Sequence, residues 1–152
     1  MVQLGYNDEQ TISANQPAIL NTIIGCSRGY VVHRNGSGTV TLSGRTYAPC
    51  QPTAKYFVRF EANIAVPEGG TAGPIAVALA IAGEPLPDSK AIVTPAAAGD
   101  YWHISCMAVI PVPKICCSEI SLENVSEPAT PATTPPPQIV MQNASMVIQK
   151  LT

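Results

Sequence analysis

The chain has 152 residues, of which 46% are apolar and only 12% are charged, with 8 Lys and Arg against 10 Asp and Glu. This length fits one domain whose core needs neither metals nor disulfides. The charges form no run of one sign along the sequence, which argues against nucleic acid as a partner because phosphate binding needs a basic patch. So few charges also indicate that protein covers part of the surface, and self-association is the simplest cover.

The N-terminal sequence MVQLGYNDEQTISANQ lacks the basic and apolar regions of a secretion signal. No window approaches the roughly 18 apolar residues of a membrane span. We therefore expect synthesis in the cytoplasm and no membrane partner. In that compartment, five irregularly spaced cysteines predict buried free thiols rather than a disulfide framework: Cys26, Cys50, Cys106, Cys116 and Cys117.

Short apolar alternations separated by Gly, Pro, Asn and Ser predict strands throughout the chain, and no window of ten or more residues has a helical period. In chain order the predicted strands are residues 18–24, 30–33, 38–42, 55–66, 75–82, 90–94, 101–110, 115–122 and 139–151, the last interrupted at Asn143. The pair Asn35-Gly36 between two of these runs is typical of a hairpin turn.

Two of the predicted strands have informative faces. Strand 55–66 alternates between a core face and a face of mixed charge and apolar character that suits an oligomer contact, formed by Phe57, Arg59, Glu61, Asn63 and Ala65. Strand 75–82 has large apolar residues on one face and only alanine on the other: Ala76, Ala78, Ala80 and Ala82. A strand face in water carries polar residues, so we expect the alanine face to point away from the core, against protein: a neighbouring subunit, the Pro-rich loop or a shell.

Residues 126–137, SEPATPATTPPP, differ in composition from the rest of the chain. Consecutive prolines do not fit inside a sheet, which predicts an exposed loop of extended, polyproline-like character. Because only residues 138–152 follow, the final strand must return to the main sheet.

Catalytic and metal-binding patterns are weak in this sequence. The two histidines, His33 and His103, lie in strand-like runs without a recognisable triad. A metal site made from both histidines and a cysteine would lack the His-x-His or Cys-x-x-Cys spacing that supports such sites. Glycine-rich phosphate-binding patterns are also missing from the sequence. The sequence therefore predicts no enzyme, and no catalytic, cofactor-binding or metal-binding residue.

The order of several segments resembles the jelly-roll superfamily of tumour necrosis factor and the complement globular head, in particular its bacterial and phage members. In chain order these segments are PAILNTIIG, GTVTLSGRTY, KYFVRFEANIAV, IAVALAIAGEPLPDS, KAIVTP, DYWHISCMAVIPV, ISLENVS and ASMVIQKL. The resemblance covers essentially residues 15–152. It implies an all-β, two-sheet antiparallel jelly-roll sandwich of the TNF-like type, with ten strands, that assembles as a homotrimer.

The same resemblance divides the chain into an N-terminal arm, residues 1–14, and a jelly-roll domain, residues 15–152. It implies a structural virion protein, namely a phage capsid decoration or head-fibre protein that binds the major capsid protein or another virion protein. We expect the arm to dock on the capsid or on a neighbouring subunit.

Three other functions remain open from the sequence. A trimeric module on a bacterial cell or spore surface would bind carbohydrate or protein, such as a host glycan. A tail or baseplate accessory module has the same fold. A cupin-type enzyme would need two or three histidines and a carboxylate around a metal, and this chain has only two histidines.

Overall fold

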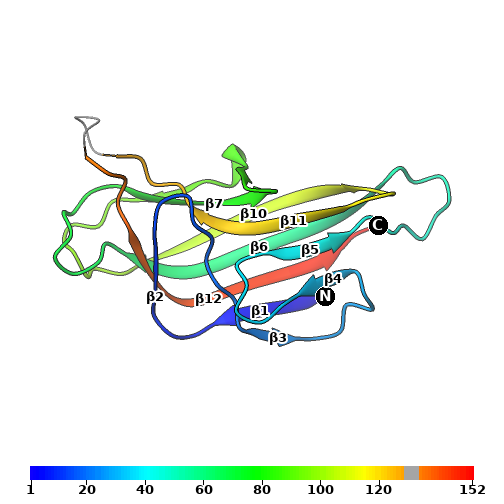
Figure 1. The fold of residues 1–152 in the computed structure, drawn as a ribbon, viewed down its shortest axis with the longest axis horizontal. Coiled ribbons are helices and arrows are strands. Elements are labelled where there is room, and N and C mark those ends of the chain that lie inside the picture. Colours follow the sequence, from blue (N-terminus) through cyan, green and yellow to red (C-terminus); the bar gives the residue numbers. More distant parts are fainter. Residues whose placement is uncertain (129–133) are drawn as a thin grey trace.

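The computed structural model describes residues 1–128 and 134–152 as an all-β sandwich of two antiparallel sheets. The strands follow the long axis of the molecule, and both termini lie near the same end (Figure 1). The one helical element is a single turn, η1 (Pro87–Ser89). Within the described residues there is no helix of the length and apolar character that a membrane crossing requires.

The first sheet has the strand order β10-β6-β12-β1-β3, with β2 also paired to β12. Its strands are β1 (Val2–Tyr6), β2 (Gln10–Ile12), β3 (Thr22–Ile24), β6 (Thr53–Ala65), β10 (Trp102–Pro113) and β12 (Ile139–Lys150). The second sheet has the order β4-β5-β11-β7-β8, with β9 also paired to β7. Its strands are β4 (Val31–His33), β5 (Val40–Ser43), β7 (Ile75–Ile81), β8 (Glu84–Pro85), β9 (Ala91–Val93) and β11 (Cys117–Asn124).

The core lies between the sheets and consists of one face of each long strand. On β6 the core residues Tyr56, Val58, Phe60, Ala62 and Ile64 are buried, as the alternation predicted, and Ala54, before the predicted strand, is buried with them. The facing strand β7 contributes Ile75, Val77 and Leu79. All nine predicted strands occur, with ends that differ by a few residues, since hydrophobic alternation identifies a strand better than its ends.

The predicted interruption at Asn143 is confirmed. The register between β12 and β6 shifts between Gln142 and Ser145, which marks a β-bulge. Asn143 has a φ of 53° there, a conformation that asparagine adopts more readily than most residues. The bulge keeps β12 paired with β6 on both sides of the irregularity.

The prediction that residues 1–14 form an arm outside the jelly roll is wrong. Strand β1 lies between β12 and β3, with Val2 opposite Ile148, and β2 pairs with β12 through Ile12 opposite Ile139. Val2 is 1% exposed and Leu4 is 0% exposed. The alternation Val2, Leu4, Tyr6 is a short strand pattern, and burial of its apolar side chains places these residues in the sheet.

The alanine face of β7 is covered by the chain itself. Ala76, Ala78 and Ala80 are buried, yet they lie outside the core between the sheets. Ala78 pairs with Glu123 and Ala80 with Ser121, both on the neighbouring strand β11. Ala82 lies in the turn to β8 instead of the strand, with a φ of 51°. The expectation that protein covers these alanines therefore holds for three of them, without a second subunit.

The Pro-rich segment begins and ends on polar contacts of Asn124. The side-chain amide of Asn124 donates hydrogen bonds to the carbonyl oxygens of Ile12 and Pro137, at 3.0 and 2.9 Å, and its oxygen accepts from the amide of Ser126 at 3.0 Å. Ser126 is buried, whereas residues 127, 128, 134 and 135 are exposed. Residues 129–133 of the predicted loop lie outside the described residues.

All five cysteines are free, but the prediction that they are buried is wrong for four of them. Cys26, Cys50, Cys116 and Cys117 are exposed, because they lie in connections and at a strand end instead of in strand interiors. Cys106 is buried in the middle of β10, and burial raises its pKa to about 11.

The burial of β1 predicts that Leu4→Ala destabilises the protein by roughly 2–5 kcal/mol, the usual loss for a buried leucine. Gln3→Ala is the matched control, since Gln3 is the exposed neighbour on the same strand. Chemical denaturation of both variants measures the difference. Equal stabilities would mean that β1 is a detachable arm after all.

The cysteine environments predict two classes of thiol in the native protein. Four thiols should react promptly with a thiol reagent near pH 8, and Cys106 only after unfolding, because the thiolate is the reactive form. A Cys106→Ala variant should lose the slow class alone. Prompt reaction of all five thiols in the unmodified protein would contradict the burial of Cys106.

Candidate functional site

The first sheet leaves one broad face open, which we call the open face. Its residues alternate with the core residues along β1, β6, β10 and β12. One row crosses five strands, as the strand registers show: Met107, Arg59, Val147, Gln3 and Ile24. Ile24 is 65% exposed, Met107 is 55% exposed and Val109 is 56% exposed. The open face therefore presents large apolar side chains along a nearly continuous sheet, which is unusual for a surface in water.

A small polar cluster lies within the open face. Arg59 and Glu61, two residues apart on β6, form an ion pair. His103 on the adjacent strand lies 3.3 Å from the side-chain oxygen of Asn63 and 4.0 Å from Glu61. A partly exposed ion pair contributes little to stability. The cluster instead pairs Arg59 with Glu61, so that this part of the face can be covered at a lower desolvation cost than unpaired charges would require.

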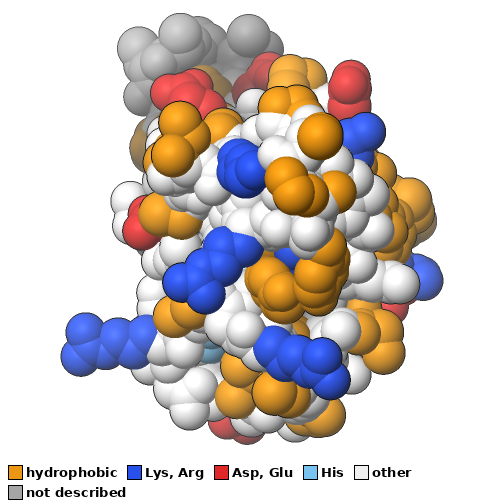
Figure 2. All heavy atoms as spheres, turned by 90° about the vertical axis from the view of Figure 1, so that its right-hand side faces the viewer, with side chains coloured by type: hydrophobic (Ala, Val, Ile, Leu, Met, Phe, Trp, Pro, Cys, Tyr) orange, Lys and Arg blue, Asp and Glu red, His pale blue; other side chains and the backbone are white. Residues whose placement is uncertain are grey.

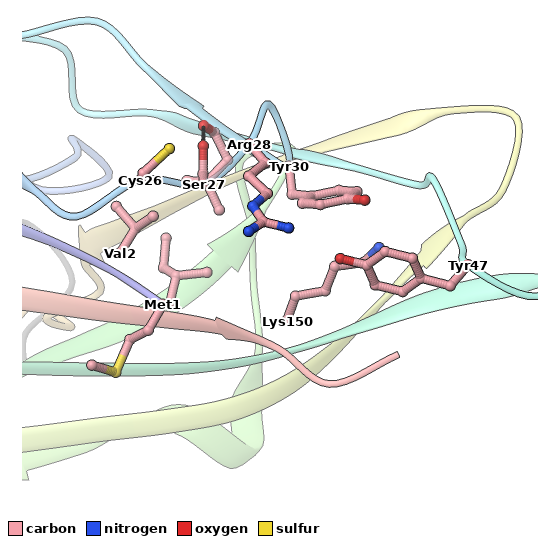
Figure 3. Close-up of a pocket in the computed structure, with 10 residues that line it drawn as sticks. Met1, Val2, Cys26, Ser27, Arg28, Tyr30, Tyr47 and Lys150 are labelled. Atoms are coloured by element: carbon pink, nitrogen blue, oxygen red, sulfur yellow. Dashed lines mark hydrogen bonds between the residues drawn. The ribbon is translucent and has the colours of Figure 1, made fainter.

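A pocket of about 240 Å³ lies at the end of the molecule where the two termini meet. We call it the end pocket; four separate parts of the chain form it, namely the N-terminus, residues 26–31, the connection between β5 and β6, and the end of β12. Its lining residues are Met1, Val2, Cys26, Ser27, Arg28, Tyr30, Val31, Tyr47, Ile148 and Lys150 (Figure 3). None of these described residues is Asp or Glu.

Two tyrosine rings hold the Lys150 ammonium group at the end pocket. Its nitrogen lies 3.8 Å from the ring centre of Tyr30 and 4.4 Å from that of Tyr47, both within cation–π distance. The two rings meet edge to face at 5.6 Å. Lys150 also donates a hydrogen bond to the carbonyl oxygen of Arg45, and desolvation lowers the pKa of its ammonium group.

Hydrogen bonds from the sandwich fix the backbone around the end pocket. The phenol of Tyr56, which is fully buried on β6, donates to the carbonyl oxygens of Ser43 at 2.6 Å and Tyr30 at 3.3 Å. Burial is the main reason that the pKa of Tyr56 is raised to about 12, so the phenol stays protonated and able to donate. The hydroxyl of Ser27 donates to the carbonyl oxygen of Val31 at 2.7 Å.

Basic residues gather at this end of the molecule although they are scattered along the sequence. Arg28 and Lys150 line the end pocket, and hydrogen bonds to the backbone bring the connections that carry Arg45 and Lys114, and the start of β6 with Lys55, to the same end. Figure 2 shows Lys and Arg side chains around a central hydrophobic patch on this face. The sequence shows no run of positive charge because the five residues come from five different segments.

The two histidines, which the sequence does not place in a triad, have different surroundings in the structure. The ring nitrogens of His33 lie within hydrogen-bond distance of two backbone carbonyl oxygens, those of Thr39 at 3.0 Å and Leu20 at 2.9 Å. His103 lies on the open face instead. In the part of the chain that the structure describes, no group of three or more His, Cys, Asp or Glu is placed to hold a metal ion.

A second hollow, a groove of about 440 Å³, lies above Ala78. One wall is formed by Pro85, Leu86 and Pro87, and the other by Ser126, Glu127 and Pro128. The one charged pair at its edge is Lys90 with Glu127, at 2.9 Å. Among the described lining residues most are apolar or proline, and the polar ones include Lys90 and Glu127, which bond to each other instead of pointing jointly at a ligand.

Comparisons with known proteins give a fold and no family. No protein-family model matches the chain, and no curated protein sequence does either. Among solved structures, the globular domain of a zebrafish complement 1qA protein is similar, with a TM-score of 0.57 and 12% identity over 99% of this chain and 97% of that one. A vertex protein of PRD1 has a TM-score of 0.41 and 13% identity over 95% of this chain and 93% of that one.

A xylan-binding domain from Paenibacillus barcinonensis has a TM-score of 0.37 and 12% identity over 96% of this chain and 97% of that one.

The similarity to the complement domain extends over nearly the full length of both chains. Together with the two antiparallel sheets, it shows that this chain has the jelly-roll sandwich fold of the complement globular head, as the sequence predicted.

Proposed function

We propose that the protein is a non-enzymatic structural module that assembles as a homotrimer through the open face of the first sheet. The observation that carries the proposal is the set of exposed apolar side chains on that face, with Ile24 at one margin and Met107 and Val109 at the other. Covering this face with a second copy removes apolar surface from water, which is the main driving force of association.

The composition of the open face supports a protein partner. Two of its charged residues, Arg59 and Glu61, are already paired with each other, Lys55 lies near one end of the face, and most of the remaining side chains are apolar or neutral. Interface centres are depleted of unpaired charge in the same way. The resemblance in sequence order to trimeric jelly rolls suggests three copies.

The finer proposal is that this trimer decorates a phage capsid, where it binds the major capsid protein or another virion protein. Its support is the order of the segments that resemble phage jelly rolls, from GTVTLSGRTY to ASMVIQKL. Since residues 2–12 belong to the first sheet, attachment to a shell would use folded surface instead of a free N-terminal arm. The three equivalent contacts of a trimer would then raise its overall affinity for the shell.

Assembly can be measured by light scattering, which should give a mass about three times the 15.9 kDa of one chain. Met107→Glu should weaken assembly by at least about tenfold, because an unpaired carboxylate buried in an interface costs several kcal/mol. Val32→Glu is the matched control: Val32 is an exposed valine on the second sheet, away from the open face. A monomer at micromolar concentration, or equal effects of both substitutions, would contradict the proposed interface.

Attachment can be measured by sedimenting phage heads assembled without the protein after mixing them with the purified chain. We expect the protein to sediment with the heads and to saturate at a fixed ratio to the major capsid protein. Heads that already carry the protein are the control and should take up no more. Binding to tails or to bacterial cells in place of heads would favour a tail module or a surface-binding module.

A further inference from the structure

We propose that the end pocket binds an acidic sugar unit, with the carboxylate or phosphate of the sugar between Arg28 and Lys150 and its ring against Tyr47 and the apolar floor. The pocket lies at the end of the molecule, whereas the proposed subunit contact lies on the side of the first sheet. Sugar binding at the end pocket therefore does not depend on the proposed trimer contact.

The positive charges of the end pocket favour an anionic ligand. Arg28 and Lys150 both line the pocket; in Figure 3 the guanidinium group of Arg28 points into it, whereas the nitrogen of Lys150 lies beside the ring of Tyr47. Neither forms an ion pair with an acidic side chain of the described residues. Charge-assisted hydrogen bonds from Arg and Lys are the usual way in which proteins hold carboxylate and phosphate groups.

The rest of the lining favours a ligand with a ring over a bare ion. Val2, Val31 and Ile148 form a buried apolar floor, and Tyr47 is an exposed ring at the rim. A volume of about 240 Å³ far exceeds the roughly 10–15 Å³ that one water needs. A sugar with a charged substituent has both the apolar ring face and the anionic group that these two sets of residues accommodate.

The pocket is also held in shape before a ligand arrives. Tyr30 is anchored through its carbonyl oxygen to the phenol of Tyr56, and Lys150 is held over two rings and bonded to the Arg45 carbonyl. A preorganised site loses less conformational entropy on binding. The Lys150 ammonium still has donors to spare, because it carries three N–H groups and one bonds to Arg45.

The test is an NMR titration of the full chain with four probes: glucuronate, glucose, glucose 6-phosphate and inorganic phosphate. Methyl signals of Val2, Val31 and Ile148 report on the pocket floor. We expect the two charged sugars to shift these signals at lower concentration than glucose or phosphate, and we expect the shifts to weaken as salt is raised. The stronger of the two charged sugars identifies the carboxylate or the phosphate as the preferred group.

Variants test the individual residues. Arg28→Gln and Lys150→Gln should each weaken binding of the charged sugars by about tenfold, the loss expected when a charge-assisted hydrogen bond is removed. Tyr47→Ser, at an exposed position of a connection, keeps the test valid should the Lys150 variant fold poorly, and it should also weaken binding. Arg34→Gln is the matched control, because Arg34 is exposed and does not line the pocket.

Three results would overturn the proposal. The first is equal binding of glucose and glucuronate, which would show that the pocket does not recognise the anionic group of the sugar. The second is binding of inorganic phosphate as tightly as glucose 6-phosphate, which would show that the sugar ring contributes nothing to the affinity. The third concerns an oligothymidylate, added as a fifth probe. If it binds more tightly than any sugar, and if Arg34→Gln weakens its binding as much as Lys150→Gln does, the basic end of the molecule would be a nucleic-acid surface instead of a sugar site.

Discussion

The position of β12 in the middle of the first sheet is the constraint on which the rest of the structure depends. This last strand pairs with β6 on one side and with β1 on the other, so Val2 lies opposite Ile148 across almost the whole chain. Bringing such distant segments together costs chain entropy, and burial of Leu4, Met146 and Ile148 offsets that cost. A slip of one residue in β12 would turn Ile148 outward and Val147 inward. Both the open face and the floor of the end pocket would then be lost.

Strand interiors could be predicted from the sequence because their signal is local. Alternation along β6 and β7 identifies the core face directly, and Asn143 marks the bulge because its conformation is a property of one residue. The N-terminal strands were missed for a related reason. Val2, Leu4 and Tyr6 alternate, but the run is short and is followed by the turn-like Asn7 and Asp8. Its place in the sheet depends on β12, which lies at the other end of the chain.

The end pocket could not be predicted because its parts share no local pattern. Tyr30 and Tyr47 lie in connections without regular structure, and Lys150 is the last residue of a strand. Cys26 is exposed beside them for the same reason, since the connections at this end form surface instead of core. The available signal was weak: tyrosines and basic residues occur together near the ends of predicted strands, as Arg28 and Tyr30 do, and in the predicted connection that carries Arg45 and Tyr47. Only the pairing of the termini brings them into one site.

The open face and the end pocket have different surface chemistry, and that difference bears on what each can bind. The open face carries exposed apolar side chains and the Arg59–Glu61 ion pair, which suits a surface that is covered permanently. The end pocket keeps unpaired cations and an aromatic rim, which suits a ligand that arrives and leaves. A shallow pocket of this size makes few contacts, so one copy would hold a sugar weakly. In the proposed trimer the pocket occurs three times, once per copy, around the three-fold axis. Ligand units repeated along a polymer could then bind all three pockets, and avidity gains of roughly 10²–10⁴ are typical when geometry allows this. Assembly through the open face would in this way convert three weak sites into one strong attachment.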